Sequence, residues 1–316
     1  MRRATLLLLV ALAGTAQAQP QPDKDIEQII VTAQRNHAGV TPNAIAHDFI
    51  RSVAAPSLLI NEIARWHMGI CPRTDGLSTR NLNAYVTGRI RDVAAQAGAP
   101  VAPEPCKSNL EILFTDQPQE ALAAVRDKSP AILGYHPATL VSHAMQAWYM
   151  TGTTDIDGRT VVDHDVSGSI AYTNGSAYDV DSNTGKPTDA AMVGVSGIPE
   201  TRIEGWKGRP EVTSDIMGAL IIADRRRTGS LALGPIADYI AMLALSRTDD
   251  YEDCQLTASI TNLLSAKCDA AQKPSQISAS DIAYLRGVYK MMDPGASLQI
   301  QQDQIASEMA KALAGK

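Results

Sequence analysis

Apolar residues recur at helical spacing over residues 79–97, where they occupy every third or fourth position. This stripe consists of Leu82, Val86, Ile90, Val93 and Ala97. Further along, apolar and polar residues alternate at 110–114, which predicts a strand. Two more helices are predicted over 41–55 and 118–128, each opened by a proline. A less regular strand is predicted over 64–71. This strand–helix–strand–helix order predicts a sheet covered by helices.

The middle of the chain predicts strands joined by turns. A strand-like segment from Met145 to Thr154 leads into the turn dipeptide Asp157-Gly158 and a second strand over 160–162, the pattern of a β-hairpin. Asn174-Gly175 marks another turn, and residues 215–223 are typical of a buried strand. We therefore expect a loop-rich β insertion here.

The last third of the chain is predicted to be helical. The expected helices cover 235–245, 255–266, 278–291 and 296–314. The third of them begins with Ser278 and Asp281 at the spacing of a capping box. Taken together, the patterns predict the α+β class, with a sheet and packed helices in a single domain over 41–316.

The first residues have the order of a secretion signal. Arg2 and Arg3 precede an apolar run from Ala4 to Gly14, and small residues at Ala16 and Ala18 bracket a cleavage site. The run of 11 residues is shorter than the roughly 20 that cross a bilayer. We expect residues 1–18 to be a cleaved signal peptide, residues 19–40 a flexible arm, and the protein to be periplasmic or extracellular.

Charge excludes one class of partner. The 316-residue chain has a net charge of −6, which becomes −8 once Arg2 and Arg3 are removed with the signal. Nucleic-acid binding needs clustered cations, and the one basic run, Arg225-Arg226-Arg227, is interpreted as a solvated turn after a strand. No later apolar stretch is long enough to predict a membrane span.

Four cysteines, an even number in an exported chain, predict two disulfide bonds. Of the three possible pairings, we expect Cys71–Cys106 and Cys254–Cys268, because each joins neighbours in the sequence. A zinc site in place of the disulfides would need C-x-x-C spacing, which the chain lacks.

Several short blocks resemble a family of exported proteins. They are Trp66 with 69–71, then 109–112, 235–243 and 281–289. Together, over about residues 60–292, they resemble uncharacterised exported proteins of Gram-negative bacteria and are distantly similar to the proteobacterial family called domain of unknown function 2927. The resemblance implies a scaffold like that of zincin-type metalloproteases.

A zincin places two histidines four residues apart on one helix, with a glutamate after the first as the base. Laid on residues 235–243, this pattern puts Ala237 and Ala241 at the ligand positions and Asp238 at the base. Methyl groups have no lone pair to give a metal, so zinc proteolysis from this helix is excluded. Asp238 is expected at the first turn of the helix, exposed or hydrogen-bonded.

Other catalytic motifs fail on spacing. Residues 194–197, Gly-Val-Ser-Gly, lack the second glycine of a nucleophile elbow, and no glycine-rich phosphate loop or dinucleotide fingerprint occurs. His136 and His143 are seven residues apart, but Pro137 interrupts any helix that would align them. No catalytic residue is therefore assigned.

Calcium is the one cofactor for which the sequence offers a weak candidate site. Asp179, Asp181 and Asn183 alternate, so three side-chain oxygens can meet in a tight loop. An EF-hand would continue with glycine and end on glutamate at position 12, where this chain has Thr184 and Ala190. The alternative is an ordinary turn rich in Asp and Asn.

The arm carries a second resemblance. Residues 27–35, Glu-Gln-Ile-Ile-Val-Thr-Ala-Gln-Arg, look like the segment through which TonB-dependent outer-membrane receptors engage TonB. Such a segment pairs as an added strand, so Ile29, Ile30 and Val31 are candidates for contact with an envelope protein. The alternative is a first β-strand or a tethered arm.

These observations favour a non-catalytic binding or envelope-associated protein on a zincin-like scaffold. The alternative is a hydrolase with an acidic site, for which the sequence offers Asp238, Asp249, Asp250 and Asp253. A solvated acidic loop explains the same cluster without chemistry.

Overall fold

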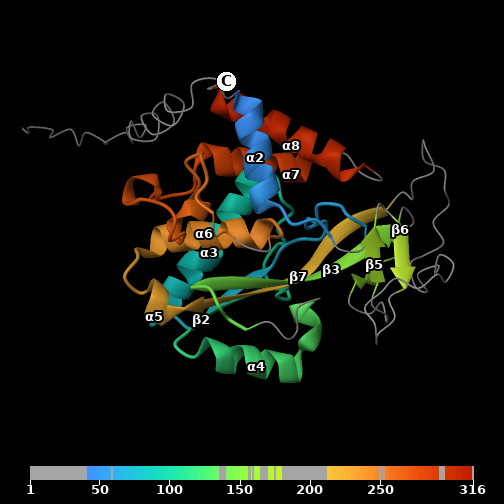
Figure 1. Ribbon diagram of the computed structural model, residues 1–316. Coiled ribbons are helices and arrows are strands. Elements are labelled where there is room, and N and C mark those ends of the chain that lie inside the picture. The colour runs from blue at the N-terminus through green and yellow to red at the C-terminus, as the bar shows by residue number, and fades with distance from the viewer. Residues whose placement is uncertain are drawn as a thin grey trace, which may run out of the picture.

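A mixed five-stranded sheet forms the centre of the molecule (Figure 1). The computed structural model describes residues 41–57, 60–134, 140–155, 158, 160–163, 170–173, 176–179, 212–248, 251, 253–291 and 296–314. In spatial order the strands are β1 (Pro72–Asp75), β2 (Leu110–Thr115), β7 (Val212–Asp224), β3 (Met145–Asp155) and β4 (Thr160–Val162). The first three are parallel to one another, and β3 is antiparallel to both β7 and β4. Strands β5 (Ile170–Thr173) and β6 (Ser176–Asp179) form a separate antiparallel pair.

Helices cover both faces of the sheet, which confirms the α+β prediction. They are α2 (Pro42–Val53), α3 (Arg80–Ala97), α4 (Pro118–Lys128), α5 (Arg225–Thr228), α6 (Leu233–Leu245), α7 (Ala279–Lys290) and α8 (Leu298–Leu313). Figure 1 shows α4 alone on one face and α3, α6 and α7 on the other, with α2 and α8 outside them. The alternation of β7 fits this arrangement, because Leu220 and Ile222 pack in the cluster under α4 while Ala219 and Ile221 join the main core.

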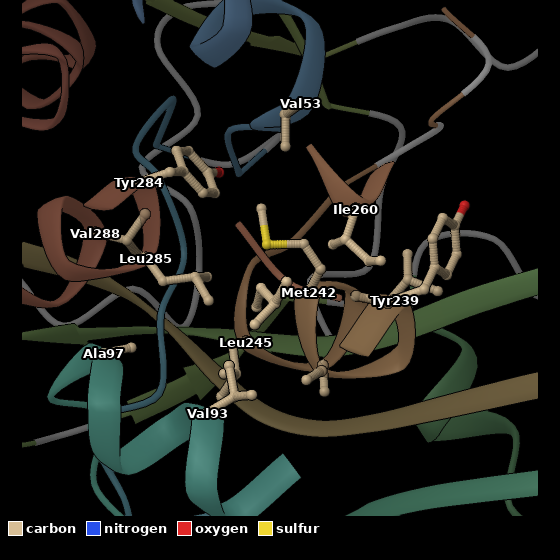
Figure 2. Close-up of a cluster of buried hydrophobic side chains, with 14 of the residues drawn as sticks. Val53, Val93, Ala97, Tyr239, Met242, Leu245, Ile260, Tyr284, Leu285 and Val288 are labelled. Carbon is tan, nitrogen blue, oxygen red and sulfur yellow. The ribbon is translucent and has the colours of Figure 1, made fainter. Parts of the chain in front are cut away.

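Helix α6 is the centre of the main core. All its residues from Ile236 to Leu245 are buried, and Asp238 is the one charged residue among them. Figure 2 shows Met242 and Leu245 of this helix among Val93 of α3 and Tyr284 and Leu285 of α7.

The predicted helix starts are confirmed by their caps. Thr41 accepts a hydrogen bond from the amide of Ala44, and Thr79 accepts one from Leu82. Ser278 and Asp281 form the expected capping box at the start of α7.

The predicted strand over 64–71 is wrong, because this segment pairs with two partners in turn. Arg65 exchanges backbone hydrogen bonds with Ser214 and Ile216, whereas Ile70 bonds to Pro100 and Ala102. Each contact is an isolated bridge, and the regular strand β1 begins only at Pro72.

The predicted helix over 255–266 is also wrong. The segment is irregular apart from the 3₁₀ turn η3 (Ile260–Leu263). The side chain of Asn262 accepts a hydrogen bond from the amide of Gln255 and donates to the carbonyl oxygens of Gln255 and Thr257. Side-chain bonds of this kind replace the helical ladder, since they satisfy backbone groups locally.

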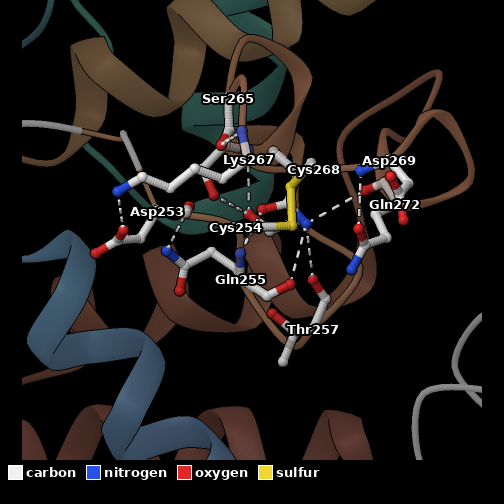
Figure 3. The surroundings of a disulfide bond; sticks show 12 residues. Asp253, Cys254, Gln255, Thr257, Ser265, Lys267, Cys268, Asp269 and Gln272 are labelled. Atoms are coloured by element: carbon white, nitrogen blue, oxygen red, sulfur yellow. Dashed lines mark hydrogen bonds and ion pairs between the residues drawn. A yellow bond between two sulfur atoms is a disulfide. The ribbon is translucent and has the colours of Figure 1, made fainter.

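Both predicted disulfide bonds are confirmed. Cys71–Cys106 joins the residue before β1 to the loop before β2, and Cys254–Cys268 closes the irregular segment after α6 (Figure 3). The two bonds are compatible with an exported protein. Within the described part of the chain, no helix is long and apolar enough to cross a membrane.

Candidate functional site

The weak calcium candidates fall mostly outside the described residues. Asp179 is the last residue of β6, and Asp181 and Asn183 lie beyond the described ranges. Among the residues that are described, no group of three His, Cys, Asp or Glu side chains is arranged to hold a metal ion. Ile29, Ile30 and Val31 also lie outside them, so the envelope contact stays a prediction.

The zincin-like positions belong to the core. Ala237 and Ala241 are completely buried in α6. Asp238 lies two residues further into the helix than predicted, because α6 begins at Leu233, and of the two expected states it is hydrogen-bonded and buried; its carboxylate pairs with Arg89 of α3 at 2.5 Å and accepts from the amide of Ile277 at 2.7 Å. This carboxylate therefore ties α6 to α3 and to the loop before α7.

The structure does not bring the described members of the acidic cluster together. Asp238 is enclosed by Arg89 and Ile277, whereas Asp253 is a surface residue whose carboxylate pairs with Lys267 at 2.6 Å. Asp249 and Asp250 lie outside the described residues.

A polar cluster at the start of β7 is paired within itself. Asp215 interacts with His67 and accepts hydrogen bonds from Thr154 and Thr213. Arg65 donates to His67 and, through Nη1, to the carbonyl oxygens of Val288 and Met291 at the end of α7. The bonds from Arg65 satisfy carbonyl groups at the C-terminal end of α7, so we assign the cluster a structural role.

A cavity lies at the opposite end of the strands. Strands β1, β2 and β7 end there at Asp75, Thr115 and Asp224, and antiparallel β3 begins there at Met145. The cavity has a volume of about 310 Å³. Ligands of open sheets with parallel strands bind beyond the carboxyl ends of those strands, which is where this cavity lies.

Five separate segments build the cavity wall. They are residues 143–147 at the start of β3, Arg227 in α5, Tyr239 and Leu243 in α6, Thr248 and Tyr251 after α6, and residues 264–267 inside the Cys254–Cys268 loop. Met145, Leu243 and the tyrosine rings contribute apolar surface to this wall.

The mouth of the cavity is cationic. Arg227 is exposed there and donates from Nη1 to the carbonyl oxygen of Ser142 at 2.6 Å, with no described carboxylate at ion-pair distance. His143 and Lys267 also line the cavity, and the ammonium group of Lys267 pairs with Asp253 (Figure 3). Among the described lining residues there is no acid, so the charge of Arg227 favours an anion in the cavity.

One tyrosine that lines the cavity has a hydroxyl group without a hydrogen-bond partner among the described residues. Tyr251 is 6% exposed and packs edge-on against Tyr239, with 5.7 Å between ring centroids. Its hydroxyl makes no hydrogen bond within the described chain. Burial raises the pKa of Tyr251 well above its usual value, so the hydroxyl stays neutral and can donate or accept. Buried polar atoms are normally paired, so this hydroxyl is an exception among the described residues.

Little in the sequence indicates this site. The interpretation of residues 225–227 as a solvated turn agrees with their exposure, but they form the single-turn helix α5, and the third arginine lines the cavity. Tyr251 stands in no motif. The contributing segments are distant in the chain, so only the folded structure brings them together.

Comparison of the chain with protein-family models, with curated proteins and with solved structures finds no match. The similarity to domain of unknown function 2927 therefore stays a prediction, and the cavity must be interpreted from its own chemistry.

Proposed function

We propose that this protein is a binding protein that acts outside the cytoplasm and holds a small organic anion in the cavity between β3 and α6. The observation that carries the proposal is that an exposed guanidinium, Arg227, lines the same cavity as apolar and aromatic side chains. Two disulfide bonds support a location outside the cytoplasm.

The dimensions of the cavity favour a small ligand. Ligand sites typically measure about 300–1,000 Å³ and combine apolar walls with a few polar groups. A volume of about 310 Å³ is at the lower end of this range, which suits a single ring or a short chain. The edge-on pair of Tyr239 and Tyr251 offers aromatic surface, so an aromatic carboxylate fits the wall and the mouth together.

Binding is favoured over acid-based hydrolysis by the kind of polar group in the cavity. The described lining offers a guanidinium, an imidazole, an ammonium and hydroxyls. Asp238 and Asp253, which the hydrolase alternative requires, interact instead with Arg89 and Lys267 outside a shared site.

Calorimetric titration with benzoate and with benzylamine tests the proposal, because the two probes share a ring and differ in charge. We expect benzoate to bind and benzylamine not to bind. Replacing Arg227 with glutamine removes the cation and should weaken benzoate binding about tenfold, the usual size of one charge-assisted contact.

The control is Lys128→Gln, which removes one positive charge at the end of α4, across the sheet from the cavity (Figure 1). Its affinity for benzoate should equal that of the wild type. Equal weakening in both variants would indicate a general charge effect, and absence of benzoate binding to the wild type would refute the proposal.

A further inference from the structure

We infer that the Cys254–Cys268 disulfide bond holds one wall of the cavity in its binding shape, so that reduction of this bond weakens anion binding. The inference rests on the proposed function and adds a redox control to the same site. Residues 264–267 line the cavity, and they lie between the two cysteines, directly before Cys268.

The first half of the loop between these cysteines is held by buried hydrogen bonds. Asp281 of α7 accepts from the hydroxyl of Ser259 at 2.5 Å and from the amide of Ile260 at 2.8 Å. The side chain of Asn262 bonds to the amide of Gln255 at 2.7 Å. None of these bonds depends on the disulfide, so this half of the loop keeps its attachment to the core when the disulfide is broken.

The half that lines the cavity is fixed at its two ends. Leu264 packs against the main core, and Cys268 is joined to Cys254 (Figure 3). Between these ends, the amide of Lys267 donates to the hydroxyl oxygen of a serine two residues earlier. The ammonium group of Lys267 also pairs with Asp253, but the two side chains are 60% and 72% exposed, so this ion pair contributes little.

Breaking the disulfide therefore frees one end of the cavity wall. A disulfide restricts the conformations open to the chain between its cysteines, and this restriction is lost on reduction. A ligand that needs the wall in one shape must then order it again, which weakens binding. By linkage, a ligand that binds the oxidised protein more tightly opposes reduction by the same factor.

A dithiol such as dithiothreitol carries out the reduction. Its thiolate attacks one cysteine sulfur, the Sγ–Sγ bond breaks, and its second thiol then displaces the resulting mixed disulfide. Two electrons and two protons pass to the protein, which gains two cysteine thiols, while the dithiol becomes a cyclic disulfide.

The other disulfide bond provides a matched control. Cys71–Cys106 joins the residue before β1 to the loop before β2, whereas the cavity lies beyond the carboxyl ends of these strands. Its reduction should therefore leave the cavity wall unchanged.

Calorimetric titration with benzoate compares two double variants with the oxidised wild type. Cys254→Ser with Cys268→Ser should weaken benzoate binding at least about fivefold, and Cys71→Ser with Cys106→Ser should keep the wild-type affinity. Wild-type affinity in the first variant, or equal weakening in both, would refute the inference and leave the anion site standing. If benzoate does not bind the wild type, both the inference and the proposed function fail.

A second measurement uses the wild type alone and so decides the case even if a variant does not fold. The protein is equilibrated with reduced and oxidised dithiothreitol, with and without saturating benzoate, and alkylation followed by mass spectrometry counts the thiols of each pair. Benzoate should shift the reduction equilibrium of Cys254–Cys268 at least about fivefold toward the disulfide and leave Cys71–Cys106 unchanged. No shift, or an equal shift at both pairs, would contradict the inference.

Discussion

Asp163 shows how a single buried carboxylate responds to its surroundings. Its side chain is 1% exposed and accepts hydrogen bonds from Thr151 at 2.6 Å and Thr153 at 3.0 Å. Burial penalises the charged form more than these bonds favour it, and so the pKa of Asp163 is raised above its ordinary value. The carboxyl group of Asp163 therefore loses its proton at a higher pH in the folded protein than in the unfolded chain.

The consequence for stability has a definite sign. Between the ordinary aspartate pKa of about 4 and the raised value, the folded protein binds more protons at this site than the unfolded chain. The contribution of Asp163 to the free energy of unfolding is thus present at low pH and lost as pH rises through this window. Urea titrations across it should show wild-type stability falling relative to Asp163→Asn. Parallel curves for the two proteins would contradict this account.

Among the elements, the contact between α7 and α8 depends on a missing side chain. A Cβ atom built on Gly287 would lie 2.8 Å from the Cα atom of Ile305, so the two helices approach closely here. Ile305 is buried in α8, and its Cα atom cannot move away without a shift of the whole helix. The glycine is therefore a packing requirement, since in the middle of a helix it otherwise costs stability.

Two glycine-to-alanine substitutions test this contact. Gly287→Ala should lower the free energy of unfolding by about 1–3 kcal/mol, the range for an overpacked core. Gly88 is in the middle of α3, and a methyl group added there would have none of the neighbouring described atoms within 4 Å. Gly88→Ala should therefore raise the free energy of unfolding by up to about 1 kcal/mol. Urea unfolding with the disulfides intact measures both, and a stabilised Gly287→Ala would show that the interface has room.

For the whole molecule, the elements with strong periodicity were predictable. The stripe over 79–97 and the alternation at 110–114 rest on local spacing, and α3 and β2 follow them. Residues 64–71 and 255–266 were not predictable in this way, because long-range partners and the side chain of Asn262 determine their conformation. Tertiary contacts override local preference at such places.

The site shows the same limit at larger scale. Arg227 and Tyr251 are brought together by β7, α5 and α6, and neither stands at a spacing that marks a motif. The zincin pattern laid on this helix predicts no zinc ligands, because Ala237 and Ala241 stand at the ligand positions, and the structure shows these alanines packed in the core. It could not indicate the cavity beside them, since a cavity is a property of the assembled layers.

The most direct test of the binding role is a crystal structure of the protein soaked with benzoate. We predict density in the cavity, with the carboxylate toward Arg227 and the ring inside the cavity. An empty cavity at saturating ligand, or density bound only elsewhere on the surface, would contradict the account.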